Sequence, residues 1–341
     1  MKNNPSFIIA EAGVNHNGEI SLAKKLIDMA SECGADAVKF QTFTAENIAS
    51  KESRKAEYQE KTTGKGSQFD MLKKLELKEA EFKELAKYCQ KNNIEFLSTA
   101  FDIKSADFLV SLGMKRIKIP SGEITKFKLI KHLCSYSLPL IISTGMSSLA
   151  EINNVLQFIE NQTEYGLSND SISILHCTTD YPTDPDDVNL RAINAIRKET
   201  SLNVGFSDHS LSKLTGALAV SIGANIVEKH ITLSKSFEGP DHKASMEKTE
   251  FLEYVRNIRS AEKLLGMEEK KPTKSETQNI AIARRGIKAT RLIKRGEKIS
   301  PSNINVLRPQ TGIPANEYFN ILGKEVNKDI QANQDIYWED I

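Results

Sequence analysis

Charged and hydroxyl-bearing side chains follow the apolar runs of this sequence at regular intervals. A glutamate, two lysines and two histidines stand out among them: Glu11, Lys39, Lys118, His209 and His230. A single polar residue after an apolar run is explained by helix capping or by contact with solvent. A lysine inside an apolar run, however, is costly to bury without an anionic partner. Because polar residues follow all eight runs, the pattern favours an anion-binding catalytic site at the ends of strands.

The two lysines are accompanied by hydroxyl groups at the ends of other runs. Lysines supply positive charge, and hydroxyls and turn amides supply hydrogen-bond donors, so together they suit a ligand with a phosphate and a carboxylate. The hydroxyl residues considered for this role are Thr99, Ser121, Ser143, Thr144 and Ser207. Three others are better explained as helix caps, namely Ser147, Ser148 and Thr178.

The two histidines His209 and His230 follow neighbouring runs, so both imidazoles can face one site. Two imidazoles, with water and substrate oxygens, make an open coordination site for Mn²⁺ or Mg²⁺. Two ligands alone are a weak signal, but their place at consecutive strand ends favours a metal. His132 and His176 are assigned structural roles, and both interpretations stay open for His16.

The elements that must position these residues alternate between strand and helix. The apolar runs lie at residues 7–10, 37–40, 95–98, 116–119, 140–143, 173–177, 203–207 and 225–229, with helix patterns between them. This alternation is typical of a parallel sheet. Eight units over roughly 250 residues favour a closed (β/α)₈ barrel over an open sheet. In such a barrel the active site lies at the carboxyl ends of the strands.

The chain divides into three predicted parts. Residues 1–268 form the barrel, residues 269–285 a polar linker rich in Lys and Glu, and residues 286–341 a small module of short strands and turns. Between the second and third runs, residues 41–77 are too long for a simple helical connection. A functional lid or binding loop and a solvated insertion remain equally open for this segment.

Composition restricts the classes of partner and the cell compartment. The chain has 341 residues, of which 39% are hydrophobic and 27% charged, and its net charge is +1. This charge argues against nucleic-acid binding by bulk electrostatics. No early apolar run is long enough for a signal or membrane segment, which indicates a cytoplasmic protein without a membrane partner. The four scattered cysteines read as reduced core thiols, not as disulfides or a zinc site.

Nine stretches, in this order along the chain, resemble the sialic acid synthase family: "IIAEAGVNHNG", "VKFQTF", "FLSTAFD", "KIPSGEI", "ISTGM", "LHCTTDYPT", "GFSDH", "EKHIT" and "GPDHKAS". That family condenses phosphoenolpyruvate with an N-acetylated amino sugar. The resemblance spans essentially the whole chain and implies an α/β fold, a (β/α)₈ TIM barrel followed by a small antifreeze-like (SAF) domain. Ala100 departs from the family pattern, in which proline is expected.

The resemblance also implies residue roles. It implies a divalent metal on His209 and His230, usually Mn²⁺, with Mg²⁺ or Co²⁺ as alternatives, and it places Glu11 near the reacting carbons. The residues implied for phosphoenolpyruvate are Lys39, Thr99, Lys118, Ser121, Ser143 and Ser207, and those for the sugar are Gln41, Tyr181, Glu228 and Asp241. It further implies a domain-swapped homodimer in which Arg308 of one subunit contacts the N-acyl group of the sugar bound to the other.

Two sugars are considered as the second substrate. The first expectation is N-acetylmannosamine, giving N-acetylneuraminate and phosphate. The alternative is 2,4-diacetamido-2,4,6-trideoxymannose, giving N,N'-diacetyllegionaminate. A different barrel synthase would need a second phosphate site for a sugar phosphate, and the strand ends carry no extra Arg or Lys group for it. A non-enzymatic carbohydrate- or ice-binding protein would leave the polar strand ends without a purpose.

Overall fold

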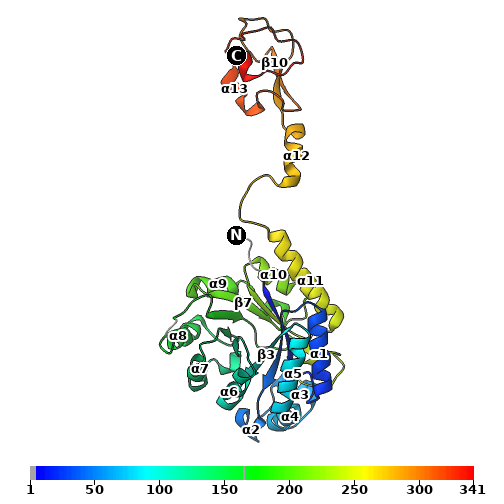
Figure 1. Cartoon of the computed structure of the whole chain (residues 1–341), viewed down its shortest axis with the longest axis vertical. Coiled ribbons are helices and arrows are strands. Elements are labelled where there is room, and N and C mark those ends of the chain that lie inside the picture. The colour runs from blue at the N-terminus through cyan, green and yellow to red at the C-terminus, as the bar shows by residue number, and fades with distance from the viewer. Residues whose placement is uncertain (1–4, 164–165) are drawn as a thin grey trace. The chain divides into compact units, whose positions relative to one another are not determined.

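The computed structural model describes residues 5–163 and 166–341. The chain forms two compact units, Met1–Gly266 and Met267–Ile341. The division falls two residues before the predicted end of the barrel. Figure 1 shows the first unit as a sheet surrounded by helices and the second as a small unit of short elements.

The first unit is built on one sheet of eight parallel strands. Their order in the sheet is β3-β2-β1-β8-β7-β6-β5-β4, and β3 and β4 also lie side by side. The predicted (β/α)₈ barrel is therefore confirmed. The strands are β1 (Phe7–Gly13), β2 (Ala37–Thr42), β3 (Glu95–Ala100), β4 (Ile117–Ile119), β5 (Leu140–Ser143), β6 (Ile172–His176), β7 (Asn203–Asp208) and β8 (Ile226–His230).

Helices cover the outside of the sheet (Figure 1). Those that follow the successive strands are α1 (Ile20–Glu32), α5 (Glu79–Lys91), α6 (Ile103–Ser111), α7 (Phe127–Cys134), α8 (Leu149–Glu160), α9 (Ala192–Thr200), α10 (Thr215–Ser221) and α11 (Lys248–Leu265). Their apolar faces pack on the outer face of the strands, as residues such as Leu26, Ile27 and Ala30 of α1 do. Ser148 caps α8 as predicted, because its hydroxyl accepts a hydrogen bond from the Glu151 amide.

The long connection between β2 and β3 contains three short helices before α5. These are α2 (Ala45–Ile48), α3 (Glu57–Thr63) and α4 (Gln68–Leu75). A cluster of Val14, Phe43, Met71 and Leu75 anchors α4 beside the first turn of the barrel. The segment is therefore a folded excursion with a small apolar core.

Strand alternation separates the inside of the barrel from the outside. One inward layer consists of Ile9, Ala37, Leu97, Ile141, Leu175 and Ile226, all buried. Every second residue along a strand lies on the same face, so the polar residues two positions further along these strands also point inward. The interior is thus apolar toward the amino ends of the strands and polar toward their carboxyl ends.

The second unit has its own core. Its strands β9 (Gly286–Ala289) and β10 (Ile304–Leu307) pair antiparallel, and a short helix α13 (Tyr318–Ile321) follows. Isoleucines dominate the core, among them Ile287, Ile293 and Ile336. The stretch predicted as a linker is partly helical, because α12 (Lys274–Ala283) forms within it and Thr273 and Glu276 make a capping box at its start.

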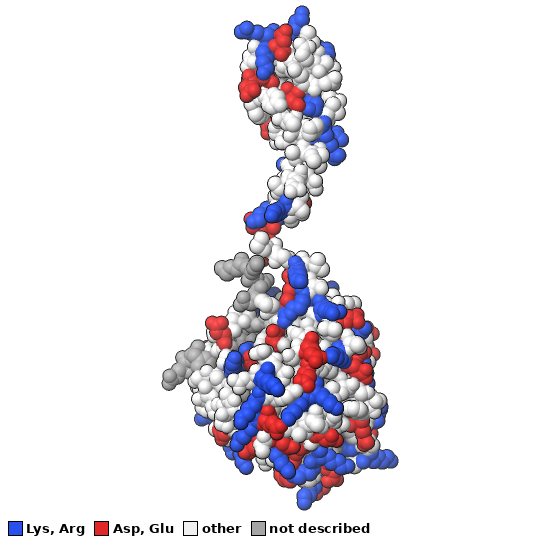
Figure 2. Space-filling model, turned by 45° about the vertical axis from the view of Figure 1, so that its right-hand side comes forward, with Lys and Arg blue, Asp and Glu red and all other residues white. Residues whose placement is uncertain are grey.

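The surface reflects the near-zero net charge. On the face in Figure 2, basic and acidic side chains are intermixed over the barrel. Within residues 5–163 and 166–341, no helix combines the length and the apolar character needed to cross a bilayer.

Candidate active site

The carboxyl ends of the barrel strands enclose a polar cavity of about 190 Å³. Of the fourteen residues to which the resemblance assigns a role, twelve line it: Glu11, Lys39, Gln41, Thr99, Lys118, Ser121, Ser143, Tyr181, Ser207, His209, Glu228 and His230. The remaining two lie elsewhere. Asp241 is buried but does not line this cavity, and Arg308 is exposed in the second unit. The structure thus brings together residues from all eight strands or the turns that follow them.

Strand register explains why side chains so far apart in sequence meet here. Glu11 of β1 is in register with Lys39 of β2 on one side and with His230 of β8 on the other. Ser207 of β7 is in register with Glu228 of β8. Paired residues on neighbouring parallel strands point to the same face of the sheet. A carboxylate at the end of the first strand therefore faces a lysine and an imidazole inside the barrel.

Two buried lysines are held by two buried carboxylates. Lys118 Nζ lies 2.8 and 2.9 Å from the two oxygens of Glu228. Lys39 Nζ lies 2.7 Å from Glu11 Oε2 and 3.7 Å from Glu228 Oε2. All four residues are less than 5% exposed. Each buried lysine therefore has a carboxylate partner within the cavity.

The surroundings give the two carboxyl groups different proton affinities. Burial raises the pKa of Glu11 to about 7, against the lowering effect of Lys39. Burial also opposes ionisation of Glu228, but Lys118 and Lys39 outweigh it and lower the pKa of that carboxyl group. Glu228 is therefore a fixed negative charge between the lysines. Glu11 can gain or lose a proton near neutral pH, which suits a general acid or base.

Hydroxyl groups surround the lysines. Lys39 Nζ donates to Thr99 Oγ1 at 3.3 Å, and Ser207 Oγ donates to Glu228 Oε1 at 3.2 Å. Ser143 Oγ is buried and has no hydrogen-bond partner in the described part of the chain. An unpaired buried hydroxyl facing a polar cavity is ready to bond a ligand. Thr144 does not share this role, since its hydroxyl donates to the Leu175 carbonyl.

Gly145 lets the turn after β5 approach the cavity wall closely. Its amide donates to Ser121 Oγ at 2.9 Å. A Cβ at this position would come within 2.1 Å of Thr179 Oγ1 and 3.0 Å of Cys177 Sγ. A side chain here would therefore displace cavity-lining groups, which explains the glycine of the "STGM" stretch.

The two imidazoles fit a divalent cation. His209 Nδ1 donates to the Thr178 carbonyl at 2.6 Å, so its Nε2 carries a lone pair near Ser207. His230 Nδ1 is buried and makes no hydrogen bond to any described residue. The ring centroids are 5.6 Å apart. Burial lowers the pKa of both imidazoles, that of His209 to about 4, which keeps them in the neutral, metal-binding form.

The metal prediction itself stays a prediction. Among the described residues, no group of three or more His, Cys, Asp or Glu side chains is arranged around a common point as metal ligands. A site with two imidazoles would depend on water and substrate oxygens for its other ligands, which keeps coordination positions open for chemistry.

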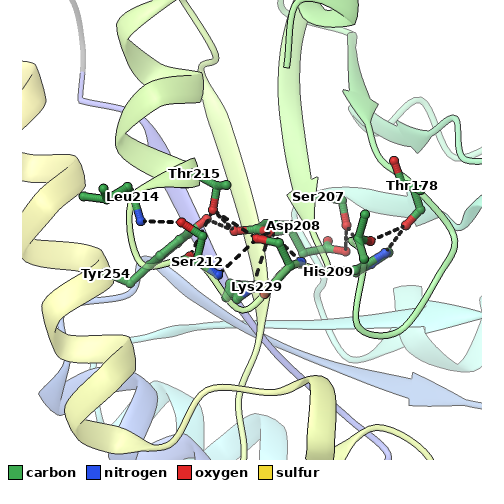
Figure 3. A network of polar contacts seen from close by, with 12 residues as sticks. Thr178, Ser207, Asp208, His209, Ser212, Leu214, Thr215, Lys229 and Tyr254 are labelled. Atoms are coloured by element: carbon green, nitrogen blue, oxygen red, sulfur yellow. Dashed lines mark hydrogen bonds and ion pairs between the residues drawn. The ribbon is translucent and has the colours of Figure 1, made fainter. Parts of the chain in front are cut away.

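A second polar network lies on the outer face of the same strands. Asp208, between Ser207 and His209, points away from the cavity and accepts hydrogen bonds from Tyr254 Oη at 2.8 Å and Thr215 Oγ1 at 2.5 Å. Lys229 forms an ion pair with Asp208 at 3.4 Å. Figure 3 shows Ser207 and His209 on the side of Thr178, and Asp208 directed toward Thr215, Lys229 and Tyr254. This network ties the ends of β7 and β8 to α10 and α11.

The histidines left open or assigned as structural lie outside the cavity. His16 is fully buried, and its Nδ1 accepts a hydrogen bond from the Gly18 amide at 3.0 Å. His176 Nε2 bonds the Val188 carbonyl at 2.9 Å, and His132 pairs with Asp107. The partners of His176 and His132 fit their predicted structural roles. His16 Nε2 is buried and has no hydrogen-bond partner among the described residues, so both interpretations of His16 stay open.

Sequence reasoning missed several residues of the site. Phe101, Pro120, Gly122, Cys177 and Thr179 also line the cavity. Thr178, interpreted as a helix cap, instead orients His209 through its carbonyl. A backbone carbonyl leaves no trace in residue type, but Cys177 and Thr179 follow β6 and could have been found by the strand-end rule.

Comparison with known proteins identifies the family. The model described as "NeuB family" matches residues 26–270, and the model of the SAF domain matches residues 284–341. The N,N'-diacetyllegionaminic acid synthase of Legionella pneumophila is 47% identical, over 98% of this chain and 94% of that protein. The protein of the same name from Campylobacter jejuni is 44% identical, over 96% of this chain and 98% of that protein.

A solved structure agrees with these relatives. The N-acetylneuraminic acid synthetase of Leptospira borgpetersenii, crystallised with citrate, is 33% identical and superposes with a TM-score of 0.71. The match covers 82% of this chain and 91% of that one. The chain therefore belongs to the NeuB family, the sialic acid synthase family that its motifs resemble, and is an enzyme of that class with a C-terminal SAF domain.

Proposed function

We propose that this enzyme joins phosphoenolpyruvate and water to 2,4-diacetamido-2,4,6-trideoxymannose, giving N,N'-diacetyllegionaminate and phosphate. The observation that carries the proposal is the cavity. Two buried lysines, two neutral imidazoles and a carboxyl group with a raised pKa converge there from different strands. These groups match an anionic enol ester, an aldehyde and a water molecule.

The lysines are suited to bind phosphoenolpyruvate. Ion pairs to Glu11 and Glu228 hold the two lysine side chains in place inside the cavity. The carboxylate and phosphate groups of phosphoenolpyruvate can then approach Lys39 and Lys118, with Ser143, Ser121 and Thr99 as further donors. Burial lowers the pKa of Lys118, so the arrival of an anion beside it also stabilises its charged form.

The reaction forms one carbon–carbon bond and breaks one carbon–oxygen bond. C3 of phosphoenolpyruvate attacks the sugar aldehyde, whose oxygen takes up a proton, and C2 becomes electron-poor. Water adds to C2 and loses one proton, which balances the proton taken up by the aldehyde oxygen. The C2–O bond to phosphate then breaks as the new C2 hydroxyl gives its proton to the departing phosphate, which leaves a keto group. Glu11 is the group placed to accept the proton of the water, because its pKa lies near neutrality and its carboxylate lies inside the cavity.

His209 and His230 are the proposed ligands of a divalent ion, with Mn²⁺ as the first expectation. Such an ion supplies Lewis-acid polarisation of the aldehyde oxygen when bound. The chain itself contributes the orientation of the imidazoles. The Thr178 carbonyl fixes the tautomer of His209, and the stacking of Tyr181 on His209, with centroids 4.1 Å apart, fixes its ring plane.

The choice between the two sugars rests on the relatives. The sequence motifs alone placed N-acetylmannosamine first. The two curated relatives with 47% and 44% identity are both named for the diacetamido product, whereas the solved N-acetylneuraminic acid synthetase is 33% identical. The diacetamido sugar is therefore the first candidate and N-acetylmannosamine the second.

The test is release of inorganic phosphate from phosphoenolpyruvate in the presence of Mn²⁺ and each sugar in turn. The proposal expects release that requires both substrates and a higher kcat/KM with the diacetamido sugar. A higher value with N-acetylmannosamine would leave the synthase class intact and reverse the sugar assignment. Failure to release phosphate with either of the two sugars would contradict the proposed function.

A domain-swapped homodimer in which Arg308 contacts the N-acyl group of the sugar remains part of the proposal. Its support is that Arg308 is exposed after β10 in a unit that has its own core. Arg308→Ala should raise the KM for the sugar about tenfold and leave that for phosphoenolpyruvate unchanged, as expected for one lost charged hydrogen bond. Equal effects on both substrates would contradict this role.

Mixing two impaired variants tests the sharing of sites between subunits. If Arg308 serves the partner's cavity, a mixture of Glu11→Gln and Arg308→Ala proteins, allowed to exchange subunits and assayed at a low sugar concentration, is more active than the average of the two proteins measured separately. The absence of this gain after verified exchange would contradict this sharing. Arg308 would then either serve the cavity of its own subunit or lie outside any active site.

We also place the enzyme in the cytoplasm. All four cysteines are buried and free, as in a reducing compartment. Cell fractionation tests the assignment, and recovery of the protein outside the cytoplasmic fraction would contradict it.

A further inference from the structure

The excursion between β2 and β3 places an aromatic ring at the edge of the active site. Tyr58 of α3 stacks on Tyr181, with ring centroids 5.2 Å apart and planes inclined by 29°. Tyr181 in turn stacks on His209 at 4.1 Å. Three rings from the excursion, the turn after β6 and the end of β7 therefore form one continuous stack. It leads from the imidazole pair toward the outside of the barrel.

Contacts within the excursion hold Tyr58 in this place. Lys55 Nζ donates to Thr63 Oγ1 at 2.8 Å and to the Gly64 carbonyl at 2.9 Å, which ties the start of α3 to its end. The Gln59 side chain accepts a hydrogen bond from the Ala56 amide at 3.0 Å. The helix itself has no buried residue. Tyr58 is half-buried on this helix, and its ring contacts Tyr181 of the barrel.

The surroundings of Tyr58 belong to the predicted sugar site. Burial raises the pKa of its hydroxyl, and the carboxylate of Asp241 adds to the effect. Asp241 and Tyr181 were both expected from the sequence to contact the sugar. Tyr58 thus stacks on one predicted sugar residue, Tyr181, and lies close enough to a second, Asp241, to feel its charge.

The proposed reaction sets the direction of the open-chain sugar relative to the stack. Its aldehyde carbon must reach phosphoenolpyruvate between the lysines and the imidazoles, so the opposite end of the sugar points outward past Tyr181. That end distinguishes the two candidate sugars. The diacetamido sugar carries an acetamido group at C4 and a methyl group at C6, and N-acetylmannosamine carries hydroxyls at both carbons.

We propose that Tyr58 is a specificity-determining residue whose ring forms the outer wall of the sugar site and favours the 4-acetamido-6-deoxy end over a hydroxylated one. This inference rests on the proposed function. Moving a methyl group from water to an aromatic surface lowers the free energy. Moving a hydroxyl group there raises it, because the hydroxyl loses its hydration without a hydrogen-bond partner in return. Selection comes from this difference between the two sugars.

Three variants test the proposal. Tyr58→Ala removes the ring, Tyr58→Phe keeps the ring and removes the hydroxyl, and Glu60→Ala changes an exposed residue of the same short helix as the matched control. For each protein, kcat/KM is measured with both sugars, and KM is measured for phosphoenolpyruvate. Circular dichroism of each variant reports whether the fold is retained.

The expected result is a split between substrates. Tyr58→Ala loses about tenfold or more in kcat/KM for the diacetamido sugar, the scale of one lost apolar contact group, and changes little with N-acetylmannosamine. The KM for phosphoenolpyruvate stays unchanged. Tyr58→Phe and Glu60→Ala keep the preference of the wild-type enzyme, because both retain the ring.

Other outcomes would overturn the inference in distinguishable ways. Equal losses with both sugars, or a parallel rise in the KM for phosphoenolpyruvate, would show that Tyr58 only supports the structure. A loss in Tyr58→Phe as large as in Tyr58→Ala would assign selection to the hydroxyl and refute the ring wall. A wild-type enzyme inactive with both sugars would refute the proposed function itself, and one that prefers N-acetylmannosamine would refute the assigned preference alone.

Discussion

Strand β8 contributes one residue to each of two buried lysine–carboxylate pairs. The two residues, Glu228 and Lys229, are neighbours in the chain and face opposite sides of the sheet. Glu228 points inward and holds Lys118 at 2.8 Å, whereas Lys229 points outward and pairs with Asp208 at 3.4 Å. Both pairs are almost completely buried. The difference lies in their partners. Asp208 also accepts hydrogen bonds from Ser210, Thr215 and Tyr254, but the inner pair borders a cavity.

The comparison separates a charge pair that stabilises the fold from one that is prepared for a ligand. The outer pair is enclosed by donors from α10 and α11, so an incoming molecule has no access to it. The inner pair leaves space beside the lysines, together with a Ser143 hydroxyl that has no partner within residues 5–163 and 166–341. Changes to the inner face should therefore reduce activity, and changes to the outer face should reduce stability.

The largest expected effect on the inner face is that of His209→Ala. Removing a proposed metal ligand should reduce metal affinity and turnover by more than about 100-fold, since weakening even an outer contact of such a ligand costs 10–100-fold. Titration of Mn²⁺ into each protein measures the affinity. His132→Ala, at a partly exposed histidine on α7, is the control and should match the wild type. Wild-type activity that survives complete chelation of divalent ions would contradict the proposed metal requirement.

Glu11→Gln should lower turnover by about 10²–10⁴-fold, the usual contribution of a general acid or base. Phosphoenolpyruvate binding, measured by calorimetry, should persist because both lysines remain. The raised pKa of Glu11 also predicts a pH dependence. Below about pH 7 the carboxyl group is protonated and cannot accept a proton, so kcat/KM of the wild type falls as the pH falls, and Glu11→Gln lacks this dependence. Glu19→Gln, at an exposed position in the following turn, is the control.

Tyr254→Phe should have the smallest effect, and it should act on stability. It removes one buried hydrogen bond to the Asp208 carboxylate and should cost about 1.5–3 kcal/mol in the free energy of unfolding. Tyr88→Phe removes a similar bond, 2.9 Å to Asp28, from the outer surface of the barrel and should cost no more than about 0.5 kcal/mol. Urea denaturation measures both. Equal losses of unfolding free energy in Tyr254→Phe and Tyr88→Phe would show that burial does not strengthen the hydrogen bond to Asp208.

Much of the inner face could be predicted from the sequence. Eight apolar runs with polar ends indicated the barrel, and lysines inside two of these runs indicated an anion site. The strand-end rule alone does not separate Asp208 and Lys229 from the neighbours that line the cavity. The alternation of side chains along a strand, however, assigns Ser207 and His209 to one face and Asp208 to the other. The period of two residues, applied to each strand end, would have separated the two pairs.

The edge of the site could not be predicted in the same way. The position of Tyr58 depends on how α3 folds back within a long excursion, and the orientation of His209 depends on the carbonyl of Thr178. Both features arise from tertiary contacts between loops, which local residue patterns do not encode. The helix α12 in the expected linker is a similar case, although its capping residues Thr273 and Glu276 were visible in the sequence.

The most direct test of the central claim compares Lys118→Met with Lys229→Met, measuring phosphoenolpyruvate affinity by calorimetry and unfolding free energy by urea denaturation for both. We expect Lys118→Met to lose phosphoenolpyruvate binding and to lose less stability than Lys229→Met, since Glu228 keeps Lys39 at 3.7 Å. Lys229→Met should lose about 3–5 kcal/mol of stability, and the folded fraction should still bind phosphoenolpyruvate. Normal binding by Lys118→Met, or loss of binding by folded Lys229→Met, would contradict the account.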